Sequence, residues 1–236
     1  MKSVIKFFLK PLIRFIRYVS YNSIPALHRA TLIDFVRDQA IADSATYIQE
    51  HIESVMLFDS CESLWDHALM RVNTKGICAE FGVFSGYSIN YFSNIHKNRI
   101  FHGFDSFEGL REDWRGTGTV KGSFDLKGTL PKVRENVKLI KGWFSQTVPV
   151  FLEQQNGNFA FIHFDADTYE STSYLLDTIG KKIVPGTIII FDEYLGFPNW
   201  KNGEFRAWKE FVNRNNIRYQ YLSFSVQQAA IEILPS

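Results

Sequence analysis

Short apolar segments that alternate with helical segments constrain this chain more than any other feature of its sequence. The apolar segments are rich in β-branched and aromatic residues, and they lie near residues 76–84, 100–105, 137–140, 159–165 and 186–191. Such runs are typical of strands that are buried on both faces of a parallel sheet. Helical periodicity follows them, near residues 86–96, 144–155, 170–183 and 204–215. This alternation predicts an α/β fold with a doubly wound sheet.

The C-terminal residues 217–234 depart from the alternation. Two strand-like runs, Ile217–Phe224 and Val226–Leu234, follow each other without a helix between them. They predict a final hairpin in which one strand is antiparallel to the rest. We therefore expect a mostly parallel, Rossmann-like sheet of about seven strands. Helices should cover both of its faces, and extra helices should precede it.

The chain before residue 76 is expected to be helical. Residues 1–20 have the pattern of a basic amphipathic helix, with five cations on one face and apolar residues on the other. This pattern predicts contact with a membrane surface, while packing on the body or on a second copy, as a homodimer, remains open. Residues 21–75 are expected to form a helical cap, in which Asp59 and Glu62 have the spacing of a capping box. Residues 76–236 would form the main domain.

Composition limits the class of protein. The length of 236 residues suits one α/β domain with additional helices. The net charge of +1 gives no general basis for binding nucleic acid. Cys61 and Cys78 fit reduced thiols better than a disulfide framework. Neither a membrane-spanning segment nor a signal peptide is recognisable, so we expect a cytoplasmic protein, peripheral at the inner membrane surface if residues 1–20 bind lipid.

A glycine-containing turn joins the first long apolar run to its helix. Gly82 and Gly86 permit a tight turn and a close approach of the backbone to a ligand. The spacing is not that of the pyrophosphate-binding fingerprint, and Glu80 suits the positive sulfonium and amine of S-adenosyl-L-methionine better than a phosphate. Asp105 ends the next strand about 20 residues later, where an acid binds ribose hydroxyls. The alternative is an ordinary turn with a surface acid.

Four acids, Asp165, Asp167, Asp192 and Glu193, follow two further strands and should meet at the carboxyl edge of the sheet. Two unit charges 4 Å apart repel by about 4 kcal/mol at an effective dielectric constant of 20. Such a group requires a cation or raised pKa values. Oxygen ligands favour Mg²⁺ or another hard divalent cation. His163 lies deeper in its strand, which favours a hydrogen-bonded core histidine over a general base.

Residues 108–131 form a long connection with weak periodicity and five glycines. Long connections of this kind are often lids or binding loops. We therefore predict a lid, and the alternative is a flexible insertion.

Four motifs in this order resemble those of the macrocin O-methyltransferase family. The motifs are Glu80–Gly86, Asp105–Leu110, Asp165–Thr172 and Ile189–Tyr194. The resemblance covers roughly residues 76–212 and implies a class I, Mg²⁺-dependent enzyme that is similar to sugar O-methyltransferases. By the same resemblance, Asp165 and Asp192 would be metal ligands and Asp167 the general base.

Further site residues are expected from these motifs. The expected cofactor contacts are Glu80, Phe81, Gly82, Gly86, Ser88, Asp105, Ser106, Phe107, Gly142 and Trp143. Glu193 departs from the family, which often has a second Asp there, but its longer side chain can still reach a metal, so it is the third expected ligand. His163 is the second candidate for proton transfer after Asp167.

The predicted activity is methylation of a hydroxyl on a sugar or a similar polyhydroxylated small molecule. One alternative is a nucleotide-sugar glycosyltransferase, because acids separated by one residue, such as Asp165 and Asp167, also bind metal in those enzymes. A second alternative is a non-catalytic, membrane-surface binding protein on a methyltransferase scaffold. The presence of all the candidate cofactor and metal acids argues against the second.

Overall fold

The computed structural model describes residues 31–235 of the chain. The predicted amphipathic helix, residues 1–20, lies outside the described residues. The chain divides into two compact units between Asp38 and Gln39, and the sheet and the site belong to the second. Helix α2 spans Leu32–Gln49. No helix within residues 31–235 is long and apolar enough to cross a membrane.

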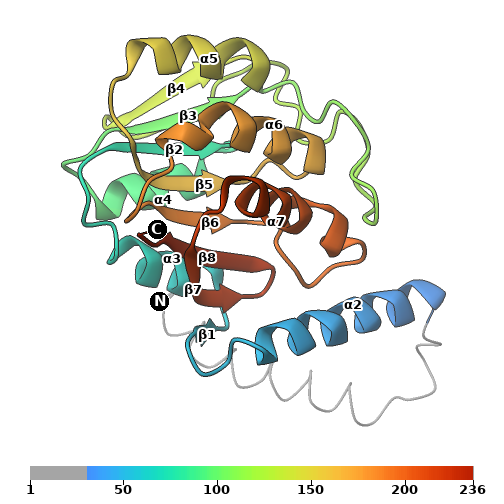
Figure 1. The fold of residues 1–236 in the computed structure, drawn as a ribbon. Helices are drawn as coiled ribbons and strands as arrows, with labels where there is room; N and C mark the ends of the chain where they lie inside the picture. Colours follow the sequence, from blue (N-terminus) through green and yellow to red (C-terminus); the bar gives the residue numbers. More distant parts are fainter. Residues whose placement is uncertain (1–30, 236) are drawn as a thin grey trace, which may run out of the picture. The chain divides into compact units, whose positions relative to one another are not determined.

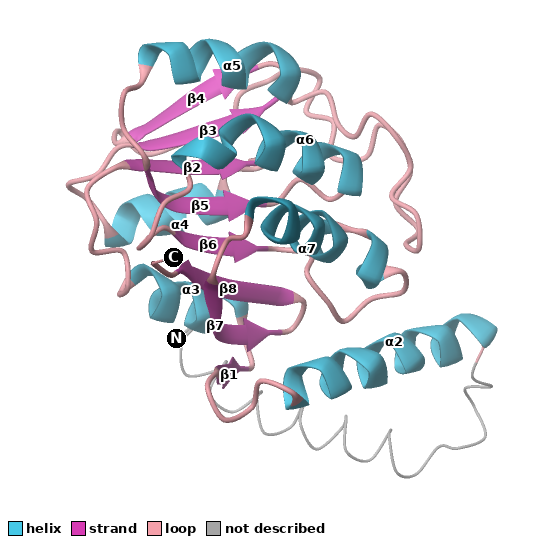
Figure 2. Cartoon of the chain, in the orientation of Figure 1, coloured by secondary structure: helices cyan, strands magenta, loops and turns pink. Residues whose placement is uncertain are grey.

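One sheet of eight strands forms the centre of the second unit (Figures 1 and 2). Its strands are β1 Met56–Phe58, β2 Ile77–Phe81, β3 Phe101–Asp105, β4 Val137–Lys141, β5 Phe159–Phe164, β6 Ile188–Phe191, β7 Tyr219–Ser225 and β8 Gln228–Ile233. They are ordered β1-β7-β8-β6-β5-β2-β3-β4, and only β8 is antiparallel to its neighbours. The predicted mostly parallel sheet with a C-terminal hairpin is confirmed.

Helices cover both faces of this sheet (Figure 2). Helices α5 (Phe144–Gln154), α6 (Tyr169–Ile179) and α7 (Glu204–Asn215) pack on one face, and α3 (Cys61–Leu69) and α4 (Tyr87–Ile95) pack on the other. Two short 3₁₀ helices, η1 (Gly180–Lys182) and η2 (Trp200–Asn202), flank α6 and α7. Every residue of β2, β5 and β6 is buried. This burial explains why their sequences are apolar except for Glu80 in β2 and His163 in β5.

The region before residue 76 differs from the prediction in two respects. Residues 31–72 are not helical throughout, because β1 pairs in parallel with β7 and raises the strand number from about seven to eight. A three-residue strand is too short to show a periodic pattern. The expected capping box also fails, because Ser60 and not Asp59 is the N-cap of α3. Its hydroxyl accepts a hydrogen bond from the backbone N–H of Ser63 at 3.2 Å.

A row of four phenylalanine rings crosses the sheet near the carboxyl ends of its strands. Phe104, Phe81, Phe164 and Phe191 are register partners in β3, β2, β5 and β6. Successive ring centroids lie 5.0, 5.7 and 5.1 Å apart, with interplanar angles of 24°, 24° and 9°. All four rings are buried under α5, α6 and α7. Because register decides which face each side chain occupies, the row fixes the level at which these strands end.

The residue that follows each of these phenylalanines lies at the same level on the edge of the sheet. These residues are Gly82, Asp105, Asp165 and Asp192. The backbone N–H groups of Gly82, Asp165 and Asp192 each donate to a carbonyl of the phenylalanine row at 2.9 Å. The turn at Gly82 and the carboxylates of Asp105, Asp165 and Asp192 therefore lie side by side at the carboxyl ends of adjacent strands.

The phenylalanine row predicts a large effect of one substitution. Phe164→Ala should lower the free energy of unfolding by about 3–5 kcal/mol, because it removes a buried ring and leaves a cavity between two stacked neighbours. Chemical denaturation measures this change. Phe124→Ala is the control, because that ring is 42% exposed and its loss should cost far less. Equal destabilisation by the two variants would contradict a central role for the row.

Candidate active site

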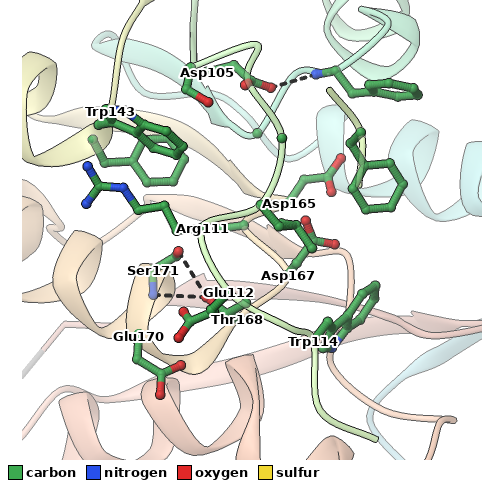
Figure 3. Close-up of a pocket in the computed structure, with 18 of the residues that line it drawn as sticks. Asp105, Arg111, Glu112, Trp114, Trp143, Asp165, Asp167, Thr168, Glu170 and Ser171 are labelled. Carbon is green, nitrogen blue, oxygen red and sulfur yellow. Dashed lines mark hydrogen bonds between the residues drawn. The ribbon is translucent and has the colours of Figure 1, made fainter. Parts of the chain in front are cut away.

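A cavity of about 500 Å³ opens at the carboxyl edge of the sheet (Figure 3). Its walls come from the ends of β2, β3, β5 and β6, the first turns of α5 and α6, and the segment 109–114. Ligands of doubly wound sheets bind in this position. The cavity is therefore the candidate active site.

Asp105 organises one end of the cavity. One carboxylate oxygen, Oδ2, accepts hydrogen bonds from the backbone N–H groups of Val83 and Phe84, both at 2.8 Å. The other oxygen, Oδ1, accepts one from the N–H of Phe107 at 2.7 Å. The turn after β2 also requires a glycine, because a Cβ on Gly82 (φ 94°) would lie 1.7 Å from the carbonyl oxygen of Asp165. Asp105 thus holds the turn, and Oδ1 retains capacity for a further donor.

The predicted cofactor residues separate into two groups. Those that line the cavity are Gly82, Asp105, Ser106, Gly142 and Trp143. Those that are not on its wall are Glu80, Phe81, Gly86, Ser88 and Phe107. Phe81 belongs to the phenylalanine row, and Gly86 (φ 80°) is the N-cap of α4. The residues of the second group are buried around the turn that follows β2 and support it without lining the cavity.

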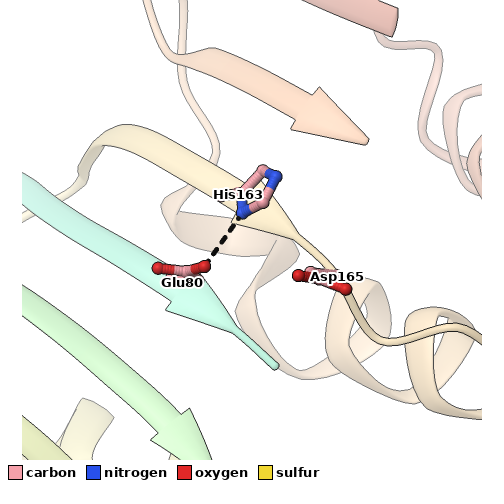
Figure 4. Close-up of side chains that lie close together, drawn as sticks. All are labelled: Glu80, His163 and Asp165. Carbon is pink, nitrogen blue, oxygen red and sulfur yellow. Dashed lines mark hydrogen bonds and ion pairs between the residues drawn. The ribbon is translucent and has the colours of Figure 1, made fainter. Parts of the chain in front are cut away.

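Glu80 and His163 form a buried pair below the cavity (Figure 4). Glu80 accepts hydrogen bonds from Ser88 Oγ and from His163 Nδ1, the latter at 3.2 Å. The other ring nitrogen, Nε2, lies 3.5 Å from Asp192 Oδ1. Burial alone would lower the pKa of His163, but the neighbouring carboxylates of Asp192 and Glu80 outweigh it and raise the pKa to about 10. His163 is fully buried between Glu80 and Asp192, and burial raises the pKa of the Glu80 carboxyl as well. His163 is not on the cavity wall.

The acids at the edge of the sheet are brought together by the fold. Asp165, Asp167 and Glu193 each place one carboxylate oxygen within 4.8 Å of the others. Burial, followed by repulsion from Asp192, raises the pKa of all three carboxyls, that of Asp167 to about 7. For Asp192 the effect of burial is outweighed by its hydrogen bond to His163, and its pKa is lowered. The predicted cluster of four acids is present on the wall of the cavity.

Two buried residues that support this cluster were missed from the sequence. Glu204, in the first turn of α7, accepts a hydrogen bond from the backbone N–H of Glu193 at 3.2 Å and faces Thr172 Oγ1 at 3.2 Å. Gln228, the first residue of β8, donates its amide N–H to Asp192. Glu204 lies on the apolar face of an amphipathic helix, and that pattern is a detectable signal. Gln228 belongs to no motif.

The predicted lid, residues 108–131, contributes directly to the cavity wall. The guanidinium of Arg111 lies 4.1 Å from the ring centroid of Trp143, which follows β4. Trp114 packs edge-on against Phe197, with ring centroids 5.6 Å apart. The first contact connects the segment to the cavity wall at Trp143, and the second connects it to the chain after β6. Such contacts are expected for a binding loop.

Sequence comparison finds a family match in the centre of the chain. Residues 79–194 match a family described as a methyltransferase domain. A curated relative from Streptomyces olivaceus, named 8-demethyl-8-(2,3-dimethoxy-alpha-L-rhamnosyl)-tetracenomycin-C 4'-O-methyltransferase, is 33% identical over 75 residues. This match covers 32% of the chain and 26% of the relative, about a quarter of its length.

Solved structures support the same fold. The calicheamicin methyltransferase CalS11 is 21% identical, with a TM-score of 0.58, and the match covers 89% of this chain and 96% of that protein. The O-methyltransferase NovP is 20% identical, with a TM-score of 0.55, and the match covers 74% and 80% of the two chains. These two structures confirm the predicted fold, and the family match gives a methyltransferase domain over residues 79–194.

The buried acids predict how stability depends on pH when no divalent cation is present. A carboxyl whose pKa is raised by folding stabilises the protein while it is protonated, and this contribution is lost as the pH rises through the folded-state pKa. The pKa values are about 7 for Asp167 and about 8 for Glu204. The loss of stability runs from the unfolded-state pKa, about 4, up to the folded-state pKa. The Tm in EDTA should therefore fall by several degrees between about pH 5 and about pH 8 and level off above about pH 8.

Calorimetry of the wild type and of Asp167→Asn measures this effect. The variant should lose less stability over the same range, because its side chain does not ionise. Mg²⁺ should raise the Tm more at about pH 8 than at about pH 6. A Tm that is constant over the range in EDTA would show that the acids are not desolvated as described.

Proposed function

We propose that this chain, which carries a methyltransferase domain, transfers the methyl group of S-adenosyl-L-methionine to a sugar hydroxyl with the help of a hard divalent cation. The observation that carries the proposal is the acid cluster on the wall of a cavity whose other end is organised by Asp105. The relatives favour a sugar as acceptor. The tetracenomycin enzyme is named as a 4'-O-methyltransferase of a rhamnosyl compound, and CalS11 as a TDP-rhamnose 3'-O-methyltransferase.

The residues of the cavity fit the cofactor. S-adenosyl-L-methionine supplies a methyl group on a positively charged sulfur. Asp105 would bind the ribose through Oδ1, which accepts one backbone hydrogen bond. The ring of Trp143 would contact the adenine. The guanidinium of Arg111 lies 4.1 Å from the centroid of the same ring. Glu80 would act indirectly, by holding the first turn of α4 through Ser88.

The acid cluster fits a hard cation. Three carboxylate oxygens lie within 4.8 Å of one another, and the buried Oε2 of Glu193 has no hydrogen-bond partner among residues 31–235. The three oxygens belong to Asp165, Asp167 and Glu193. Asp192, which is outside that set, repels all three acids. We propose Asp165, Asp192 and Glu193 as ligands of Mg²⁺ or a similar ion, and we assign Asp167 to proton transfer. Such an ion supplies positive charge that favours ionisation of the acceptor hydroxyl. His163 and Gln228 would hold Asp192 from behind.

In the proposed reaction, Asp167 takes the proton of the acceptor hydroxyl. The hydroxyl oxygen forms a bond to the methyl carbon as the carbon–sulfur bond breaks, and the sulfur keeps the electron pair. A pKa of about 7 suits Asp167 to this role. His163 is fully buried and does not line the cavity, so we assign it to charge balance and not to proton transfer. Residues 108–131 would close over both substrates as a lid.

The cofactor assignment predicts a loss of binding when Asp105 is removed. Asp105→Ala should weaken binding of S-adenosylhomocysteine by about 1–3 kcal/mol, because the ribose and the turn lose their acceptor. Isothermal titration calorimetry measures this change. Glu153→Ala is the control, because Glu153 is an exposed acid of α5 that does not line the cavity. Unchanged affinity of Asp105→Ala would exclude the assignment.

The roles of the acids predict two distinct phenotypes. Asp165→Asn and Asp192→Asn should bind Mn²⁺ weakly and lose most turnover, while their affinity for S-adenosylhomocysteine changes little. Asp167→Asn should still bind Mn²⁺ but turn over about 10²–10⁴-fold more slowly, the usual loss for a general base. Electron paramagnetic resonance reports Mn²⁺ binding, and release of S-adenosylhomocysteine in the presence of glycosides reports turnover. Full activity in excess EDTA would remove the cation from the reaction.

A further inference from the structure

A second cavity of about 310 Å³ lies beside the first. Glu112, Trp114, Asp167, Thr168 and Glu170 line both cavities, so the two share one wall. Figure 3 labels all five of these residues where they line the first cavity. The far side of the second cavity is formed by residues 197–206, which follow β6 and lead into α7.

The position of this cavity suits an acceptor. Asp167 is the acid of the edge cluster that lines both cavities, and Asp165, Asp192 and Glu193 line only the first. A hydroxyl held in the second cavity can therefore meet Asp167 while it faces the first cavity. Methyl transfer requires this arrangement, because donor and acceptor must approach in line.

The lining of the second cavity suits a sugar ring. Trp114, Tyr169 and Phe197 provide aromatic surfaces for the apolar face of a ring. Asn199 and Asn202 provide side-chain amides for hydroxyl groups. The Asn199 amide is already fixed, because its N–H groups donate to the carbonyl of Arg115 at 3.1 Å and its oxygen accepts from Asn202 at 2.7 Å. The carbonyl oxygen of the Asn202 amide is left for a ligand.

The charge of the lining disfavours phosphate. Four acids line the cavity, namely Glu112, Asp113, Asp167 and Glu170, against two arginines, Arg115 and Arg206. Arg206 is already paired, since its Nε lies 2.8 Å from Glu210 Oε1 and its guanidinium lies 4.5 Å from the ring centroid of Tyr169. Neither Glu112 nor Glu170 forms an ion pair within the described part of the chain. A diphosphate would meet this negative wall.

We propose that the second cavity is the acceptor subsite and that it binds an unphosphorylated glycosyl unit, a neutral glycoside or an amino sugar, in preference to a sugar nucleotide. This inference rests on the proposed function and adds the class of acceptor to it. It places methylation after glycosyl transfer, because a free or attached glycoside is then the substrate. The Glu112 and Glu170 carboxylates would disfavour the diphosphate of a sugar nucleotide, and the Asn202 side chain would contact the glycosyl unit directly.

The test uses the full chain saturated with S-adenosylhomocysteine. Saturation-transfer NMR and calorimetry compare matched probes: methyl α-L-rhamnopyranoside with TDP-rhamnose, methyl glucoside with UDP-glucose, and methyl glucosaminide with UDP-glucosamine. At least one glycoside should bind at least about tenfold more tightly than its nucleotide partner. Asn202→Ala should weaken glycoside binding without changing the affinity for S-adenosylhomocysteine, because Asn202 lines only the second cavity.

Substitutions of the acids Glu112 and Glu170 test the effect of charge on the choice of acceptor. Glu112→Gln combined with Glu170→Gln should reduce the preference for the glycoside about tenfold or more. Glu135→Gln is the matched control, because it removes an exposed acid before β4, at the opposite edge of the sheet. Tighter binding of the nucleotide by the wild type would overturn the inference. Binding of no glycoside by a chain that still binds S-adenosylhomocysteine would also overturn it, whereas failure to bind S-adenosylhomocysteine would instead contradict the proposed function.

Discussion

The register of the four central strands is the constraint on which the site depends. The stacked rings of Phe104, Phe81, Phe164 and Phe191 hold β3, β2, β5 and β6 at one level. The next residue of each strand is then a glycine or an aspartate of the cavity. A slip of one residue in any of these strands would turn its phenylalanine to the other face and move its site residue away. Packing in the core and geometry in the site are therefore the same property of this sheet.

The second constraint is electrostatic. Of the acidic side chains around one end of the cavity, Glu193 and Glu204 are buried, and Asp165, Asp167 and Asp192 are partly buried. The buried His163 lies beside them, 3.5 Å from Asp192. His163 lies between Glu80 and Asp192, whereas Asp165, Asp167 and Glu193 have no such ion-pair partner among residues 31–235. Burial, followed by repulsion from Asp192, raises the pKa of these three carboxyls. Ionisable groups with strongly shifted pKa values are typical of functional sites. A bound cation would relieve this repulsion, which is why we connect the cluster to metal binding.

Much of this fold follows from patterns visible in the sequence. Buried parallel strands are continuously apolar, so β2, β5 and β6 were expected where they occur, as was the hairpin of β7 and β8. Asp105 and the acids after β5 and β6 were expected because strand ends meet at one edge. The strand β1 was missed, because three residues carry no period and its partner, β7, is distant in sequence. Glu80 was expected beside the cofactor, but only the fold shows that His163 and Ser88 occupy it. The role of Gln228 could not be predicted from the sequence, because it comes only from the contact with Asp192 in the folded chain.

The most direct measurement is a crystal structure of the chain with S-adenosylhomocysteine and Mn²⁺, with the ion located by anomalous scattering. Our account predicts an anomalous peak coordinated by Asp165, Asp192 and Glu193. It also predicts the ribose on Asp105, with Asp167 facing the second cavity. An ion bound elsewhere in the chain, or a cofactor outside the 500 Å³ cavity, would contradict it.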